Sequence, residues 1–135
     1  MTAAIEVLPA TLEVRGLNAA FQTRDGLLTA VRDLSLHLAP GRILGLVGAS
    51  GSGKSVPGFP ILGRLDKPGR VTAGEILFQG RDLRRLKPRE LRELQGDRLA
   101  MIFQDPMMTL NPVLRVDTQM IEAVRAHRRV SQAEA

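Results

Sequence analysis

Eight consecutive residues, Gly48 to Ser55, read GASGSGKS and constrain the fold more than any other stretch of the sequence. They match the pattern G-x-x-x-x-G-K-[S/T] in full, and they follow an apolar run, Arg42 to Gly48, typical of a buried strand. Glycine allows backbone turns that are closed to other residues, so successive amides can point into one concavity and hold an anion. The sequence therefore predicts a strand, a phosphate-binding loop and a helix, in that order.

The polar residues of this loop suit the binding of a nucleotide polyphosphate. We expect the amides from about Gly51 to Ser55 to face the phosphates, reinforced by the positive end of the following helix. Lys54 would place a cation on the β- and γ-phosphates, and the Ser55 hydroxyl would ligate Mg²⁺. The alternative, a flexible Gly/Ser linker, does not explain the strand that leads directly into the lysine and serine. The predicted binding residues are Gly48, Ser50, Gly51, Ser52, Gly53, Lys54 and Ser55.

The residues that follow the loop conflict with the expected helix. That helix would begin near Gly53 and end at about Leu65, but Pro57 and Pro60 fall inside it. Each proline removes a backbone donor and costs about 3 kcal/mol in a helix interior. We therefore predict that the helix after Ser55 is kinked or shortened, and that the affinity for nucleotide falls.

Length and composition restrict the class of protein. A chain of 135 residues has room for one domain with a hydrophobic core. It contains no cysteine, which rules out disulfides and thiolate metal sites and is typical of a reducing cytoplasm. We find no apolar run long enough to cross a bilayer and no signal-peptide pattern at the N-terminus.

The net charge of +5 raises the question of a nucleic-acid partner. The arginines are scattered and interleaved with acidic residues, as in RDLRRLKPRELRELQGDR, and the chain contains no tyrosine or tryptophan. We therefore expect no nucleic-acid partner.

Further apolar patterns predict strands alternating with helices. The Asp25-Gly26 turn joins two alternating segments, which indicates an antiparallel pair. The remaining pattern favours an α/β fold with an antiparallel β part. Strands are predicted at residues 11–17, 30–38, 42–48 and 98–104, a strand-and-turn unit at residues 75–83, and helices at residues 87–96 and 117–129.

A second motif narrows the family. The segment from Ala100 to Pro106 contains IFQDP and is followed by LNP, which resembles the glutamine loop of ABC transporter ATP-binding subunits. The resemblance is to the oligopeptide, dipeptide and nickel importer subfamily. It covers nearly the whole chain, because LEVRGLNAAF, AVRDLSLHLAPGRILGLVGASGSGKS, GRVTAGEILFQGRDL and RLAMIFQDPMMTLNPVL occur in the family's order.

This resemblance implies an ABC-type P-loop NTPase domain that binds ATP and Mg²⁺. It implies that Phe21 stacks on adenine and that Gln104 helps to coordinate Mg²⁺ and the attacking water. It also implies that the loop from Asp105 to Val116 meets the membrane-spanning permease subunits. From the residues alone, Phe21 has the alternative of an ordinary core residue at a strand end, and Met107, Met108 and Leu110 could equally cover the chain's own core.

Family members continue with a signature sequence (LSGGQ-like), an apolar strand ending in Asp-Glu and a later histidine, none of which this sequence contains. His37 and His127 lie elsewhere and are interpreted as surface residues. The chain therefore resembles an incomplete domain: residues 1–135 as the N-terminal portion, with the phosphate loop at 48–55 and the glutamine loop at about 103–112. We expect little ATP turnover by this chain alone.

The resemblance implies a peripheral subunit on the cytoplasmic face of the inner membrane, paired with a second ATP-binding subunit and coupling ATP hydrolysis to import of peptides or similar solutes. One alternative is a non-catalytic remnant that binds nucleotide weakly or not at all. Another is an unrelated small P-loop kinase, which would leave IFQDP and LNP unexplained. A coding frame that continues with LSGGQ and an Asp-Glu strand would distinguish the first reading from the remnant.

Overall fold

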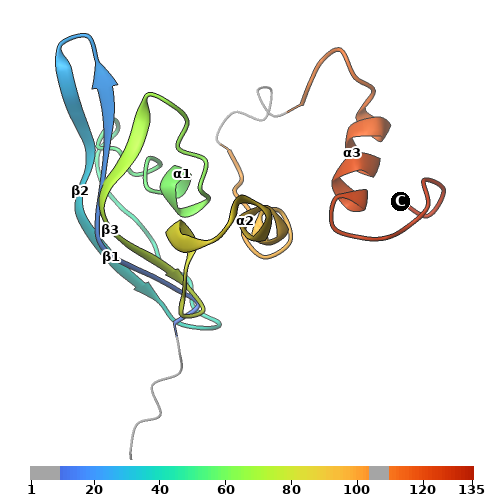
Figure 1. The fold of residues 1–135 in the computed structure, drawn as a ribbon, viewed down its shortest axis with the longest axis horizontal. Helices are drawn as coiled ribbons and strands as arrows, with labels where there is room; N and C mark the ends of the chain where they lie inside the picture. Colours follow the sequence, from blue (N-terminus) through green and yellow to red (C-terminus); the bar gives the residue numbers. More distant parts are fainter. Residues whose placement is uncertain (1–9, 104–109) are drawn as a thin grey trace, which may run out of the picture. The chain divides into compact units, whose positions relative to one another are not determined.

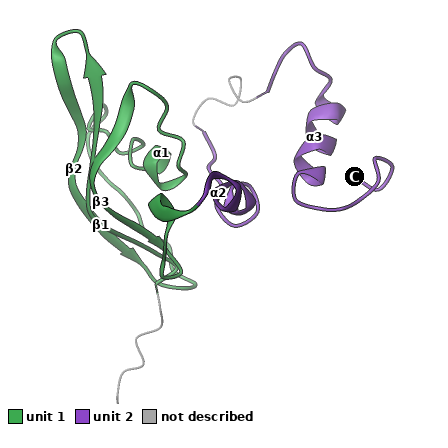
Figure 2. Cartoon of the chain, in the orientation of Figure 1, with its two compact units in different colours: residues 1–86 green, residues 87–135 purple. Residues whose placement is uncertain are grey.

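The computed structural model describes residues 10–103 and 110–135 (Figure 1). The chain divides into two compact units, residues 1–86 and residues 87–135, drawn in green and purple in Figure 2. Each unit is described by itself. Within the described residues, none of the helices combines the length and apolar character needed to cross a membrane.

The first unit is built on a four-stranded antiparallel sheet. Strand β1 lies between β2 and β3, and β4 pairs with the outer edge of β3, so the order is β2-β1-β3-β4. The tight turn predicted at Asp25-Gly26 joins β1 to β2, and Gly26 has a φ of +122°. The predicted antiparallel pair is therefore confirmed. The strands are β1 (Leu12–Thr23), β2 (Gly26–Leu38), β3 (Gly69–Phe78) and β4 (Arg81–Asp82).

The core of this unit is apolar and belongs mainly to the central strand. Because β1 has a partner on each side, its apolar residues are covered best. Leu17 and Ile76 are fully buried, and burying such a side chain stabilises a fold by roughly 1.5–3 kcal/mol. The other buried apolar residues are Val14, Ala19, Ala20, Val31, Phe78 and Leu83, the last in the short 3₁₀-helix η1 (Leu83–Arg85).

The β1–β2 pair is irregular in its middle. The register shifts between Val14 and Ala20, and Asp33 on β2 adopts a left-handed φ of +47°. The side chain of Asn18 accepts a 3.1 Å hydrogen bond from the Asp33 amide, and the amide of Gly16 donates to the Ser35 hydroxyl at 2.9 Å. These bonds satisfy backbone groups that the interrupted ladder leaves unpaired, so the sheet bends here without losing its core.

The strand predicted at Arg42 to Gly48 is absent, and this prediction is wrong for the chain as it stands. The segment is irregular and exposed, with Ile43 100% and Val47 95% accessible. A run that is apolar on both faces suits a parallel strand with neighbours on both edges. No strand in residues 10–103 or 110–135 pairs with this segment, so it lacks the neighbours that such a strand needs.

The helix predicted from Gly53 to Leu65 is also much shorter than expected. Only α1 (Gly58–Ile61) is helical, and residues 54–57 form turns. The helix is therefore shortened, as predicted, and Pro57 is the residue that precedes it.

The second unit contains two exposed helices, α2 (Pro88–Leu94) and α3 (Val116–Arg125). Pro88 is the first residue of α2, and the Lys87 amide donates to the Glu90 carboxylate at 2.9 Å, so the predicted start is confirmed. The strand predicted at residues 98–104 is not formed over residues 98–103, where only Leu99 makes an isolated bridge, to Gln95. Gln104 lies outside the described residues.

Candidate phosphate-binding site

The loop from Gly48 to Ser55 has the backbone geometry that its glycines allow. Gly51 and Gly53 have φ values of +76° and +83°, a left-handed conformation that L side chains rarely adopt. The Ser52 amide donates to the Ala49 carbonyl at 3.2 Å and closes a turn between them. The loop therefore curls back on itself, as a loop that surrounds an anion must.

Four of the five backbone donors that the sequence assigns to phosphate are not used by the protein, whereas the Ser52 amide donates to Ala49. Within the described part of the chain, the amides of Gly51, Gly53, Lys54 and Ser55 donate no hydrogen bond. All four residues are exposed or half-buried, so these amides remain available to a ligand. An anion with several acceptor oxygens is the group best matched to such a set of donors.

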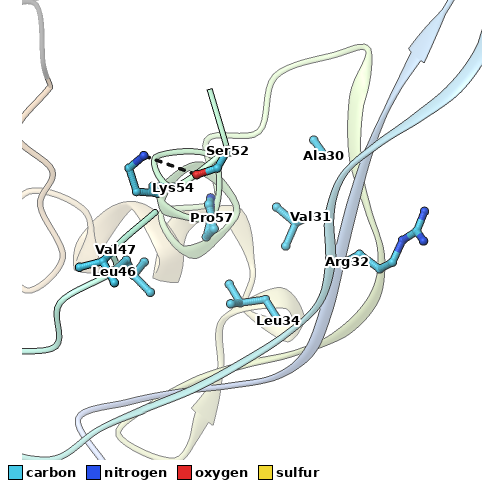
Figure 3. Close-up of a pocket in the computed structure, with 10 residues that line it drawn as sticks. Ala30, Val31, Arg32, Leu34, Leu46, Val47, Ser52, Lys54 and Pro57 are labelled. Atoms are coloured by element: carbon cyan, nitrogen blue, oxygen red, sulfur yellow. Dashed lines mark hydrogen bonds between the residues drawn. The ribbon is translucent and has the colours of Figure 1, made fainter. Parts of the chain in front are cut away.

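Lys54 turns its ammonium group onto its own loop. Its Nζ donates to the Ala49 carbonyl at 2.5 Å and lies 3.4 Å from the Ser52 hydroxyl (Figure 3). The cation is therefore held at the mouth of the loop by neutral acceptors. A phosphate oxygen would be a stronger, charge-assisted partner for the same group.

The loop approaches strand β2 closely at Gly53. A methyl group on Gly53 would lie 3.6 Å from the Ala30 carbonyl oxygen, in ordinary van der Waals contact. A methyl group on Gly48 would lie 2.8 Å from the Ser52 hydroxyl oxygen, so a larger residue there would displace that side chain. Gly48 therefore lets the loop pack against its own residues, whereas Gly53 is favoured by its left-handed φ of +83° and not by the contact with β2.

A cavity of about 240 Å³ lies between the loop and β2 (Figure 3). Polar and apolar groups share its walls about equally, and its polar side chains are those of Arg32, Ser52 and Lys54. Of the predicted site residues, Ser52, Gly53 and Lys54 line this cavity, whereas the other residues of the loop do not. The remaining lining residues are Ala30, Val31, Arg32, Leu34, Leu46, Val47 and Pro57.

The contribution of β2 was not found by sequence reasoning. Alternation identifies Val31 and Leu34 as apolar strand positions, but no local signal shows which strand lies beside the phosphate loop. That neighbour is set by the tertiary arrangement of the first unit.

Phe21 is not brought to this cavity. It is half-buried on β1 opposite Gly69 of β3, and a methyl group on Gly69 would lie 2.8 Å from its ring. The ring therefore lies against the β3 backbone.

His37 and His127 are exposed, as predicted, and a methyl group on Gly96 would lie 2.6 Å from the His127 Nε2.

The carboxyl groups with shifted pKa values are not residues of the predicted site. A hydrogen bond from Arg15 lowers the pKa of Glu13, and one from Arg115 lowers the pKa of Asp117.

Among residues 10–103 and 110–135, no cluster of three or more His, Cys, Asp or Glu residues could hold a metal ion. The donor set of the loop therefore fits a polyphosphate through amides and one lysine, whereas α1 begins too late to contribute its amides.

The glycine-rich loop and its companion sheet define the class: an α/β P-loop NTPase fold of the ABC type, with an antiparallel β subdomain, present in part. The chain belongs to the ABC transporter family, whose model matches residues 31–135. The dimeric ABC transporter cassette MJ0796 has the same fold, with a TM-score of 0.72 at 22% identity over 89% of this chain and 49% of that one.

Relatives in peptide transport are considerably closer in sequence. The chain is 47% identical over 124 residues to the oligopeptide transport ATP-binding protein OppD of Salmonella typhimurium, covering 92% of this chain. It is 44% identical over 118 residues to the dipeptide transport ATP-binding protein DppD of Escherichia coli, covering 87% of this chain. The chain spans 37% and 36% of the length of these two relatives.

Proposed function

We propose that this chain is the ATP-binding portion of a subunit that powers import of peptides or similar solutes. The observation that carries the proposal is the set of unused amides at Gly51, Gly53, Lys54 and Ser55, with the Lys54 ammonium beside them. The names of its relatives supply the transported class, and the ABC family supplies the link to transport.

In this proposal the loop performs most of the binding. The amides and Lys54 hold and orient the β- and γ-phosphates, and Lys54 leaves Ala49 to neutralise their charge. Mg²⁺, when bound, supplies further charge neutralisation between the phosphates, and Ser55 and Gln104 are the side chains that would hold it. Phe21 is proposed to stack on adenine, which requires its ring to be accessible beside Gly69.

Membership of this family also supports a proposal about partners. We propose that the loop from Asp105 to Val116 meets the membrane-spanning permease subunits and that a second ATP-binding subunit completes the site. Residues 1–135 then form the N-terminal portion of an ABC-type domain, with the phosphate loop at 48–55 and the glutamine loop at about 103–112. Such a subunit is peripheral on the cytoplasmic face of the inner membrane.

The second candidate is a non-catalytic chain with weak nucleotide binding. Two observations favour it: the Arg42 to Gly48 segment is not a strand, and α1 begins only at Gly58. Both features weaken the framework that holds the loop. The two candidates therefore differ in their affinity for Mg-ATP, and measuring that affinity distinguishes them.

Calorimetric titration of Mg-ATP into the full 135-residue chain tests the proposal. We expect Lys54→Ala to weaken binding by roughly ten- to a hundredfold, because a hydrogen bond to a charged group is lost. The matched control is Lys67→Ala, another lysine of the first unit that lies outside the loop. Equal affinity for the unchanged chain and Lys54→Ala would contradict the proposed role, and no binding by either would favour the second candidate.

A further inference from the structure

The backbone between the phosphate loop and α1 forms tight turns where a helix could have continued. The Val56 amide donates to the Gly53 carbonyl at 3.0 Å, and the Gly58 amide donates to the Ser55 carbonyl at 3.2 Å. Both bonds join residues three apart, the spacing of a tight turn and not of an α-helix. The spacing of an α-helix first appears in the bond from the Ile61 amide to the Pro57 carbonyl, at 3.3 Å.

Pro57 explains why the helix cannot begin earlier. An α-helix that started near Gly53 would need residue 57 to donate to the Gly53 carbonyl, and proline has no N–H. That carbonyl accepts from Val56 instead. The proline ring also disfavours a helical backbone at Val56, the residue before it. Pro57 is buried against the cavity, so packing holds it in this place.

Pro60 has a different position and a different consequence. It is the third residue of α1, within the first turn, where an amide has no helical partner and proline is tolerated. Although both prolines break the predicted pattern, only Pro57 stands at the boundary. The two residues therefore offer a comparison within one short segment.

We propose that Pro57 is a positioning residue that weakens the polyphosphate site of this chain by delaying the start of α1. The inference rests on the proposed function. Because α1 has four residues and begins after the loop, its dipole adds little at Lys54 and Ser55. The phosphate is then held by the loop amides and the Lys54 cation alone. Restoring a donor at position 57 should let the helix begin near Gly53 and align these amides with its axis.

The structural half of the inference is tested without nucleotide. In the full chain, NMR Cα chemical shifts of Lys54 to Val56 should move toward helical values in Pro57→Ala. They should stay unchanged in Pro60→Ala and in Pro40→Ala, which alters an exposed proline elsewhere in the same unit. Because Pro57 is buried, Pro57→Leu is a second variant that restores the donor and keeps apolar volume. Unchanged shifts in folded Pro57→Ala and Pro57→Leu would overturn the inference.

The affinity half uses Mg-ATP titrations with the same variants. Pro57→Ala and Pro57→Leu should bind roughly fivefold tighter than the unchanged chain, the factor expected from a restored helix N-terminus. Pro60→Ala and Pro40→Ala should bind as the unchanged chain does, even where Pro60→Ala lowers the thermal midpoint. Equal or weaker binding by both Pro57 variants would overturn the inference while leaving Lys54-dependent binding, and so the proposed function, intact.

A different pattern identifies failure of the proposed function itself. If neither the unchanged chain nor any variant binds Mg-ATP, the proposed function and the affinity half of this inference fail together. The chemical shifts still decide whether Pro57 sets the start of α1. The two failures are therefore distinguishable from one set of variants.

Discussion

Gly74 of β3 packs tightly against the backbone of Gly16 in β1. A methyl group on Gly74 would lie 2.5 Å from the Gly16 carbonyl oxygen. The neighbouring Leu17 Cα would be 2.6 Å from the same methyl group. Gly74 also has a φ of +95°, which L side chains rarely adopt. The close approach of β1 and β3 at the irregular part of the sheet therefore requires glycine at this position.

Gly74→Ala should destabilise the chain by at least about 2 kcal/mol, since it adds a backbone clash to backbone strain. Gly80→Ala is a matched control, because Gly80 has a similar φ of +79° with nothing within 4 Å of its added methyl group. We expect the control to cost only about 1–2 kcal/mol, from strain alone. Urea unfolding of the two variants measures the difference, and equal losses would contradict the backbone contact.

The buried part of β1 gives a second prediction. Leu17 is fully buried, and Leu17→Ala should cost about 2–5 kcal/mol through lost burial and a cavity. Leu28→Ala removes the same atoms from β2 at a side chain that is 59% exposed, and should cost well under half as much. Thermal or urea unfolding provides the measurement. Similar losses for both variants would mean that the core does not lie where β1 meets its neighbours.

The exposed segment from Arg42 to Gly48 predicts self-association. Ile43 and Val47 are almost completely exposed, and the backbone beside them has no strand partner within the described residues. Replacing both with serine should lower light scattering and sedimentation-detected oligomers, with little change in the unfolding midpoint. Val113→Ser, at an 87% exposed residue of the second unit, is the control. A large drop in the midpoint would show instead that the two side chains are packed.

The Glu13–Arg15 pair predicts a dependence of stability on pH. Arg15 donates to both carboxylate oxygens of Glu13, at 2.8 and 2.9 Å, and this lowers the pKa of Glu13 below its ordinary value of 4.5. Because the pKa of Glu13 is lowered in the folded state, the pair's contribution to the free energy of unfolding is present above pH 4.5. It is lost as the pH falls through the folded-state pKa.

We therefore expect the unfolding midpoint of Glu13→Gln to fall less steeply below pH 4.5 than that of the unchanged chain. The effect should be small and should shrink further in high salt, because the pair is exposed to solvent. Asp117 and Glu134 also have lowered pKa values, and they contribute equally to both proteins. Parallel curves across this range would contradict a role for the pair.

Local sequence signals predict the antiparallel sheet and the backbone turns of residues 48–55 well. The Asp25-Gly26 turn, the alternation in β2 and the start of α2 at Pro88 all depend on residues close in sequence, and all are confirmed. The glycines of the loop predict left-handed turns in the same way, and Gly51 and Gly53 adopt them.

The failures concern segments whose structure depends on distant partners. Arg42 to Gly48 and residues 98–103 read as buried strands, but an apolar run becomes a parallel strand only when neighbouring strands bind its edges. The cavity beside β2 was missed for the same reason, because the packing of the loop on Ala30 is a tertiary contact. The sequence predicts that both Pro57 and Pro60 disturb the helix. That Pro60 lies in the first turn of α1, where proline is tolerated, follows only from the observed start of α1 at Gly58.

The irregular middle of the β1–β2 pair also affects how copies of this chain meet one another. β2 is an edge of the sheet, and a long, flat edge would accept a strand from another molecule. Asp33 interrupts the regular backbone of β2 with its left-handed φ, its amide donates to the side chain of Asn18, and its carboxylate adds a charge to this edge strand. A strand with such an irregularity and a charge is a poorer template for pairing with another molecule than a flat apolar one.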